Sequence, residues 1–141
     1  MHTLTPSRGL RLCNPLNIRR SADLWRGLAP QQNDPEFFTF RSMAWGYRAA
    51  FVVLRTYILS RKTDTVAAII GRWAPPSDHN DTPVYIRQVC ALTGFAPDRR
   101  LNPFDPRDMA PLVAAMARVE CGQPARMDEV RQGWELYYGA E

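Results

Sequence analysis

Histidine and cysteine are scarce in this sequence, and their scarcity narrows the kinds of site that it can build. The chain contains two histidines, His2 and His79, and three cysteines. Cys13, Cys90 and Cys121 cannot all pair within one chain, and they lack the close C-x-x-C spacing of zinc and redox sites. We therefore expect free thiols, no metal site and no cofactor.

Long apolar runs are missing as well. No run approaches the roughly 20 residues that a helix needs to cross a bilayer, so we expect no membrane insertion. The first twelve residues, "MHTLTPSRGLRL", contain no apolar core of a secretory signal peptide. We therefore expect a protein made in the cytoplasm, which would reach the periplasm or cell wall through a phage particle, lysis or a specialised secretion machine.

The charge is moderately basic, with 18 basic against 14 acidic residues and a net charge of +4. This balance favours an anionic partner such as nucleic acid, the anionic cell wall or a membrane surface. Alternatively, the arginine-rich composition reflects genomic base composition alone. No run of lysine and arginine exceeds two residues, so nucleic acid is not the predicted partner.

The 141 residues, 45% of them apolar, predict a single domain over 1–141 that is mainly α. Residues 1–41 are broken by glycine and proline, and "FFTF" indicates a short β-hairpin within 16–40. After Ser42, a plausible N-cap, helices are expected at about 43–61, 65–73, 83–93, 106–121 and 128–138. Gly46 is a poor helix residue, which suggests that another backbone or a ligand approaches closely there.

A carboxylate interrupts the apolar side of the helix expected at 106–121. Asp105 and Gly122 have the residue types of its N-cap and its left-handed stop. At about 100° per residue, Glu120 points within about 20° of Met109, inside the apolar stripe. Either Glu120 pairs with an arginine or leaves a frayed last turn, or it is the general acid of a glycosidase.

Three stretches carry a resemblance to known proteins. "MARVECG" (116–122) resembles the end of the catalytic helix of lysozyme-like lytic transglycosylases, where an apolar helix ends in Val-Glu-Ser-Gly. "RGLRLCNPLNIRR" (8–20) and "RWAPPSDHNDTPVYIRQV" (72–89) are similar to a family of small phage- and prophage-associated proteins. That family has the pattern R-G-(I/L)-R-N-N-N-P-G-N-I-R, W-x-G, F-x-x-F, W-A-P-P-x-x-N-D-T-x-x-Y-I and V-E-N-G. This chain departs from it at Leu12, Cys13, Leu16 and Cys121.

The resemblance implies a lysozyme-like fold with circularly permuted elements, in which the helix of Glu120 has moved from first to near last. Permutation is physically reasonable because chain termini commonly lie close together. It predicts that residues 8–19 lie beside 120–122. Because Leu16 replaces a glycine, it cannot comfortably adopt a positive φ, and we expect an altered loop there.

Seven polar residues of these motifs are candidate substrate-binding residues: Asn14, Asn17, Arg19, Asn80, Asp81, Thr82 and Tyr85. The two asparagines near the N-terminus suit sugar N-acetyl groups, or they satisfy local backbone in a turn. Arg19 meets a peptidoglycan carboxylate or an acidic neighbour. Asp81 or Thr82 is alternatively a helix N-cap. Tyr85 is expected to direct its hydroxyl towards Glu120.

The tryptophans have two interpretations. Trp25 and Trp45 either stack on sugar rings or are buried, and burial is the commoner outcome for tryptophan. Trp73 is expected in the core. None of the three is therefore counted among the candidate site residues.

The resemblance implies cleavage of the β-1,4 bond between MurNAc and GlcNAc in peptidoglycan, by a lytic transglycosylase or muramidase with Glu120 as general acid and base. An inverting hydrolase needs a second carboxylate about 6.5–9.5 Å away, for which Asp78 and Asp81 are the candidates. A lytic transglycosylase needs one acid, and we favour this mechanism.

Peptidoglycan glycan strands are the expected partner, together with components of a phage virion or secretion system. The alternative from another class is a non-catalytic phage structural or wall-binding protein with the same fold. A third hypothesis, which rests on charge alone, is a basic protein that binds nucleic acid.

Overall fold

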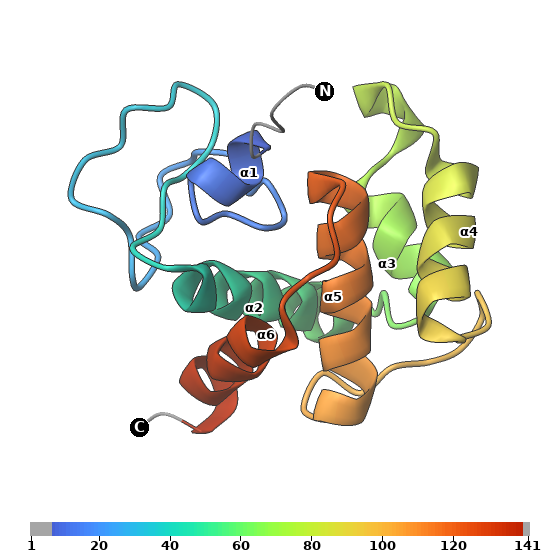
Figure 1. Cartoon of the computed structure of the whole chain (residues 1–141). Helices are drawn as coiled ribbons and strands as arrows, with labels where there is room; N and C mark the ends of the chain where they lie inside the picture. The colour runs from blue at the N-terminus through green and yellow to red at the C-terminus, as the bar shows by residue number, and fades with distance from the viewer. Residues whose placement is uncertain (1–6, 140–141) are drawn as a thin grey trace, which may run out of the picture.

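The computed structural model describes residues 7–139, in which the chain forms a mainly helical single small domain (Figure 1). His2 and both ends of the expected 1–141 domain lie outside the described residues. The α-helices are α1 (Arg8–Arg11), α2 (Met43–Arg61), α3 (Val66–Trp73), α4 (Thr82–Thr93), α5 (Pro106–Cys121) and α6 (Met127–Trp134). Two shorter turns are η1 (Pro76–Asp78) and η2 (Glu135–Gly139). The mainly α prediction is therefore confirmed.

Side-chain caps explain where the helices begin. The side chains of Ser42, Thr65, Asp81 and Asp105 each accept a hydrogen bond from a backbone N–H in the first turn of α2, α3, α4 and α5. Such bonds satisfy donors that the first turn of a helix leaves without a partner. At the other ends, Gly94 and Gly122 adopt the left-handed conformation (φ 78° and 75°) that stops α4 and α5.

The last helix differs from its expected range of 128–138. The α-helix ends at Trp134, and residues 135–139 continue as a π-helical turn. Aromatic packing accounts for this segment, because Trp134 meets Phe51 of α2 edge to face and Tyr137 stacks on the same ring, with ring centroids 5.1 and 5.6 Å away. Val130 is fully buried beneath them.

The predicted hairpin within 16–40 is wrong in its extent. Residues 7–139 contain no extended strand, and this segment has two isolated antiparallel bridges, Arg19 with Phe37 and Leu28 with Phe40. Side chains replace part of the backbone ladder, since the Asn14 amide binds the carbonyls of Ile18 and Phe38. The short helix α1 was not expected.

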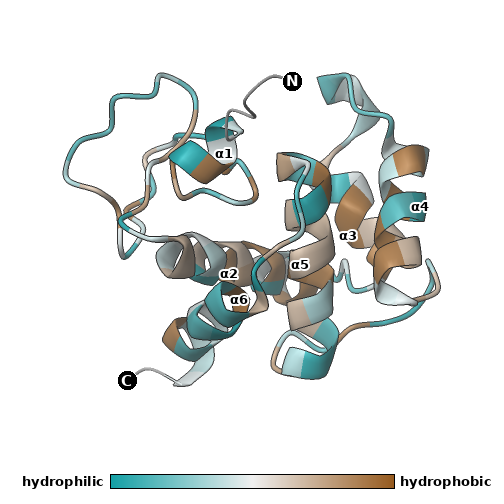
Figure 2. Ribbon diagram, viewed as in Figure 1, coloured by the Kyte–Doolittle hydropathy of each residue, from teal (hydrophilic) through white to brown (hydrophobic). Residues whose placement is uncertain are grey.

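Helix α5 runs through the middle of the molecule, between α2, α4 and α6 (Figure 1). Hydrophobic positions concentrate on these central helices, while the long loop before α2 is mostly hydrophilic (Figure 2). The largest fully buried side chains come from the loop at 13–17 and from α2, α3, α4 and α5: Leu16, Tyr47, Phe51, Leu54, Val66, Ile69, Ile70, Val89, Met109, Leu112, Val113 and Met116. No helix in this described part is both long and apolar enough to span a membrane.

The N-terminal loop is fixed against the start of α2 through Gly46. A Cβ atom at this position would overlap the carbonyl oxygen of Cys13 and the ring of Pro15. A larger residue would therefore push the loop away from the helix. The expected close approach of a second backbone is confirmed, and it positions residues 13–17 over the C-terminal end of α5.

Candidate active-site groove around Glu120

Glu120 occupies the last turn of α5 and is partly buried. Its carboxylate accepts three hydrogen bonds from three separate segments. Asn17 Nδ2 donates to Oε1 at 2.9 Å, and Trp73 Nε1 and the Tyr85 hydroxyl donate to Oε2 at 3.2 and 2.9 Å. The carboxylate is therefore held in one orientation by the N-terminal loop, the end of α3 and the first turn of α4.

The hydrogen-bond count distinguishes the two carboxylate oxygens. A carboxylate oxygen has two lone pairs that can accept hydrogen bonds. Oε2 uses both of them, on Trp73 and Tyr85, whereas Oε1 uses one, on Asn17. Oε1 therefore keeps one free position at which a proton or a ligand donor can bind.

Tyr85 lies beneath the carboxylate and is buried. Burial raises the pKa of its hydroxyl well above the ordinary value of 10, and the nearby charge of Glu120 raises this pKa further. The hydroxyl consequently keeps its proton at any physiological pH and remains a donor. The expectation that Tyr85 directs its hydroxyl towards Glu120 is confirmed.

Asn17 reaches Glu120 because its backbone is left-handed, with a φ of 54°. Asparagine adopts this conformation more readily than most residues. Its Oδ1 packs against Gly9, where a Cβ atom would come within 2.5 Å, and this oxygen is buried without a hydrogen-bond partner. The predicted proximity of residues 8–19 to 120–122 is therefore confirmed, and Cys121 Sγ also contacts the Pro15 carbonyl at 3.3 Å.

A groove of about 440 Å³ opens beside Glu120. It is lined by Leu16, Asn17, Ile18, Arg19, Asp23, Trp25, Phe37, Val53, Tyr57, Arg72, Trp73, Ala74, Pro75, Asp78, Asn80 and Glu120. A second hollow of about 380 Å³ shares Asp23, Trp25, Val53 and Tyr57 with this groove and continues to Leu24 and Thr56. The two hollows therefore adjoin one another, and together they offer a chain-like ligand more room than the groove alone.

The groove has mixed polarity. Arg19 and Arg72 contribute positive charge, while Asp23 and Asp78 join Glu120 as carboxylates. The guanidinium of Arg72 lies 5.4 Å from the ring centre of Tyr57, which itself packs near Trp73. Aromatic faces beside polar groups are common in sites that bind organic ligands with many polar groups.

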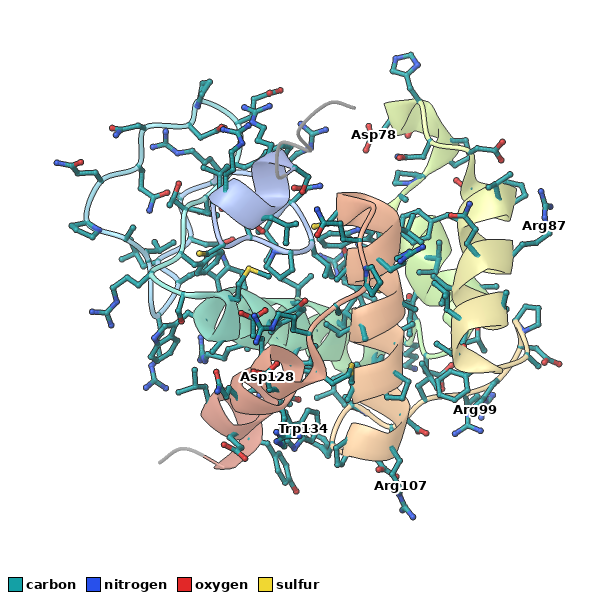
Figure 3. The ribbon with its side chains drawn as sticks, in the orientation of Figure 1. Asp78, Arg87, Arg99, Arg107, Asp128 and Trp134 are labelled. Carbon is teal, nitrogen blue, oxygen red and sulfur yellow. The ribbon has the colours of Figure 1, made fainter. Side chains whose placement is uncertain are left out.

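Arg19 and Asn80 line the groove as expected for ligand-binding residues. Asn80 also donates to the Pro75 carbonyl at 3.2 Å and thereby supports the loop that forms one rim. In Figure 3, Asp78 extends from this rim. In this view, which has the orientation of Figure 1, Asp78 lies at the same end of the molecule as the C-terminus of α5 (Figure 3).

The structure corrects the prediction that Asn14 binds substrate. Its side chain is fully buried and makes three hydrogen bonds to backbone, two as donor to the carbonyls of Ile18 and Phe38 and one as acceptor from the Ile18 N–H. Both N–H donors of its amide are used and the side chain is shielded from the groove by burial, so Asn14 holds the loop together instead of binding substrate.

The structure also corrects the prediction that Asp81 and Thr82 bind substrate. Asp81 is the N-cap of α4, where it accepts from the Val84 N–H. Thr82 is buried and donates to the Ala74 carbonyl at 2.6 Å. Neither lines the groove. Asp81 is therefore also excluded as the second catalytic carboxylate of an inverting hydrolase. Of the two candidates, Asp78 and Asp81, Asp78 lines the groove.

Three groove residues were missed as site residues. Trp73 was expected in the core, yet it donates to Glu120 from the groove wall. Trp25, for which the sequence allows either sugar stacking or burial, is a partly buried groove residue. Asp23 lines the groove without belonging to any of the sequence motifs. The W-A-P-P motif gave a signal for Trp73, because a side chain preceding a rigid loop is well placed for a site.

The expected free thiols are observed at Cys13, Cys90 and Cys121. Leu16 avoids the strain that a positive φ would impose; the left-handed positions in the loop are Cys13 and Asn17. In the described part of the chain, no group of three or more histidine, cysteine, aspartate and glutamate side chains is arranged to hold a metal ion.

Fold and site together define a small mainly helical protein with a fixed carboxylate beside an elongated groove. The chain is 36% identical over 138 residues to "Protein P5" of Pseudoalteromonas phage PM2, across 94% of this chain and 84% of that protein. The chain therefore belongs to the same family as this phage protein. No protein-family model matches the sequence.

Proposed function

We propose that this protein cleaves the glycan strands of peptidoglycan at the MurNAc-β-1,4-GlcNAc bond, with Glu120 as general acid and base in a circularly permuted lysozyme-like domain. The observation that carries the proposal is the carboxylate itself, which three side chains hold in the wall of a groove. A structural role alone would not call for this arrangement beside an open groove. The similarity to a phage protein fits a protein that acts on a bacterial envelope.

The single-acid mechanism fits the geometry. Protonated at Oε1, Glu120 donates its proton to the glycosidic oxygen as the bond from that oxygen to MurNAc C1 breaks. The resulting carboxylate then takes the proton of the MurNAc C6 hydroxyl, whose oxygen closes an anhydro ring on C1. Proton and electron pairs balance, and no water is consumed.

Three features of the site assist this sequence. Trp73 and Tyr85 saturate Oε2, so the exchange of protons is confined to Oε1. Asn17 fixes Oε1 from the side of the N-terminal loop. Arg19 supplies positive charge in the groove for the carboxylates of peptide stems.

Replacement of Glu120 by glutamine tests the assignment. Glutamine preserves the size of the side chain and cannot transfer a proton, so release of sugar ends from purified peptidoglycan should fall at least about 100-fold. The variant should unfold at nearly the same temperature as the wild type. Retained activity in a folded E120Q protein would reject Glu120 as the acid.

Mass spectrometry of the products separates the remaining alternatives. Anhydro ends indicate a transglycosylase, and reducing ends indicate a muramidase, for which Asp78 or Asp23 in the groove would serve as base. Absence of both ends with the wild-type protein, together with binding to the wall, would instead assign a non-catalytic wall-binding role.

A further inference from the structure

Three arginines gather on α2 and the loop before it, away from the groove. Arg48 and Arg55 are seven residues apart and therefore share one side of α2. Val53 and Tyr57 line the groove from the same helix, and each is about 160° round the axis from Arg55. Arg26 joins this side because its guanidinium stacks on Trp45, one turn before Arg48.

Two of these guanidinium groups lie over aromatic rings. Arg26 lies 5.4 Å from the ring centre of Trp45, and Arg55 lies 5.4 Å from that of Tyr137. A guanidinium has five N–H groups, so a group that lies over a ring keeps N–H groups that can donate to another ligand.

Arg48 is the third arginine of this group. Its Nε is buried and has no hydrogen-bond partner. Burial lowers the pKa of Arg48, and the positive charges of Arg26 and Arg55 lower it further, as expected for like charges on one side of α2. Among residues 7–139, none of the three arginines forms an ion pair with a carboxylate.

We propose that Arg26, Arg48 and Arg55 form a binding site for a phosphate group, supplied as free phosphate ion or as the headgroup of an anionic phospholipid. A like-charged cluster is costly unless an anion neutralises it. Phosphate suits three guanidinium groups better than a carboxylate, because it offers more acceptor oxygens and a larger charge.

The surroundings are compatible with a lipid surface. Val52 and Leu59 follow Arg48 and Arg55 by about one turn each on the same side of α2, where Val52 is partly exposed and Leu59 is 55% exposed. A side that alternates arginine with at least partly exposed apolar residues, next to Trp45, resembles helices that rest in a headgroup layer. The site is separate from the groove and does not depend on the proposed cleavage reaction.

Co-sedimentation with lipid vesicles tests the lipid source. The full chain should bind vesicles that contain phosphatidylglycerol and not vesicles of phosphatidylcholine alone. The double variant Arg48→Gln/Arg55→Gln should weaken binding about tenfold or more, since each basic residue at an anionic surface contributes severalfold in affinity. Arg26→Gln, a change in a loop, gives a second variant if the double variant unfolds.

A control variant that loses the same number of positive charges distinguishes binding at this site from general electrostatic attraction to the vesicle. Arg87 and Arg118 are exposed and form no ion pair within the described residues, and Arg87 lies on the outer side of α4 (Figure 3). The double variant Arg87→Gln/Arg118→Gln should bind within about twofold of the wild type. An equal loss in both double variants would overturn the proposal.

Thermal unfolding in added inorganic phosphate tests the free ion. Phosphate should raise the unfolding temperature of the wild type and of the control, and not that of Arg48→Gln/Arg55→Gln, because a ligand that binds the folded state stabilises it. Stabilisation without vesicle binding identifies free phosphate as the source. Absence of both effects in the wild type would overturn the site.

Discussion

Asn17 and Glu120 are joined by a hydrogen bond of 2.9 Å although 103 positions separate them in the chain. The bond ties the loop near the N-terminus to the end of α5, and it closes one side of the groove. The left-handed backbone of Asn17 and the missing side chain of Gly9 both serve this contact. Disturbing the loop should therefore disturb the carboxylate.

Asn17→Gly should lower the rate of glycan cleavage about tenfold, because it removes a hydrogen bond to a charged group while glycine keeps the left-handed backbone. Steady-state release of sugar ends measures the loss. Cys13→Gly is the matched control, since Cys13 has nearly the same φ of 53° and does not bind Glu120. Equal losses in both variants would assign the effect to loop flexibility.

Tyr85→Phe should lower kcat about tenfold with little change in KM, because Tyr85 binds Oε2 from beneath and does not line the groove. Trp73→Phe should change both constants, since Trp73 binds Oε2 and also forms part of the groove wall. Tyr137→Phe is the control, because it removes a tyrosine hydroxyl that donates to the Pro103 carbonyl and does not line the groove. A purely structural role for Tyr85 would lower stability and leave kcat of the folded protein unchanged.

Asn14→Ala should destabilise the fold by about 2–4 kcal/mol, because it leaves two buried carbonyls and one N–H without partners. The free energy of unfolding in urea measures this cost. Asn80→Ala removes one exposed hydrogen bond and should cost less than about 0.5 kcal/mol. Equal stability of the two variants would contradict a structural role for Asn14.

Stability should fall as the pH rises above about 10. Burial raises the pKa values of Tyr57, Tyr85 and Tyr137, so each keeps its proton in the folded state at a pH where the unfolded chain has lost it. The stabilising effect is complete below the ordinary tyrosine pKa and is lost as the pH rises towards the folded values. Unfolding temperature and tyrosinate absorbance, measured together, should change in parallel. Tyrosinate that forms at an unchanged unfolding temperature would contradict this.

The helices of this protein could be predicted closely because their signals are local. Ser42, Asp105 and Gly122 act within one turn of their own positions, through caps and a left-handed stop. The expected hairpin failed for the opposite reason, since the Asn14 side chain takes over hydrogen bonds that a strand would have made. Strand propensity does not take into account a side chain that replaces the backbone hydrogen bonds of a β-ladder.

The sequence by itself determined the helical composition and the position of Glu120 on an apolar stripe, since these follow from local signals and helical spacing. The contact of Tyr85 with Glu120 was expected from a motif, and the packing of α4 on α5 makes it. The tertiary structure alone decided which polar residues face the groove. Asn14, Asp81 and Thr82 turned inwards or became caps, while Trp73 turned from the expected core to the carboxylate. Adjacent motif residues can be distinguished in this way only by the contacts of segments distant in the chain, because buried polar groups must find partners wherever the fold supplies them.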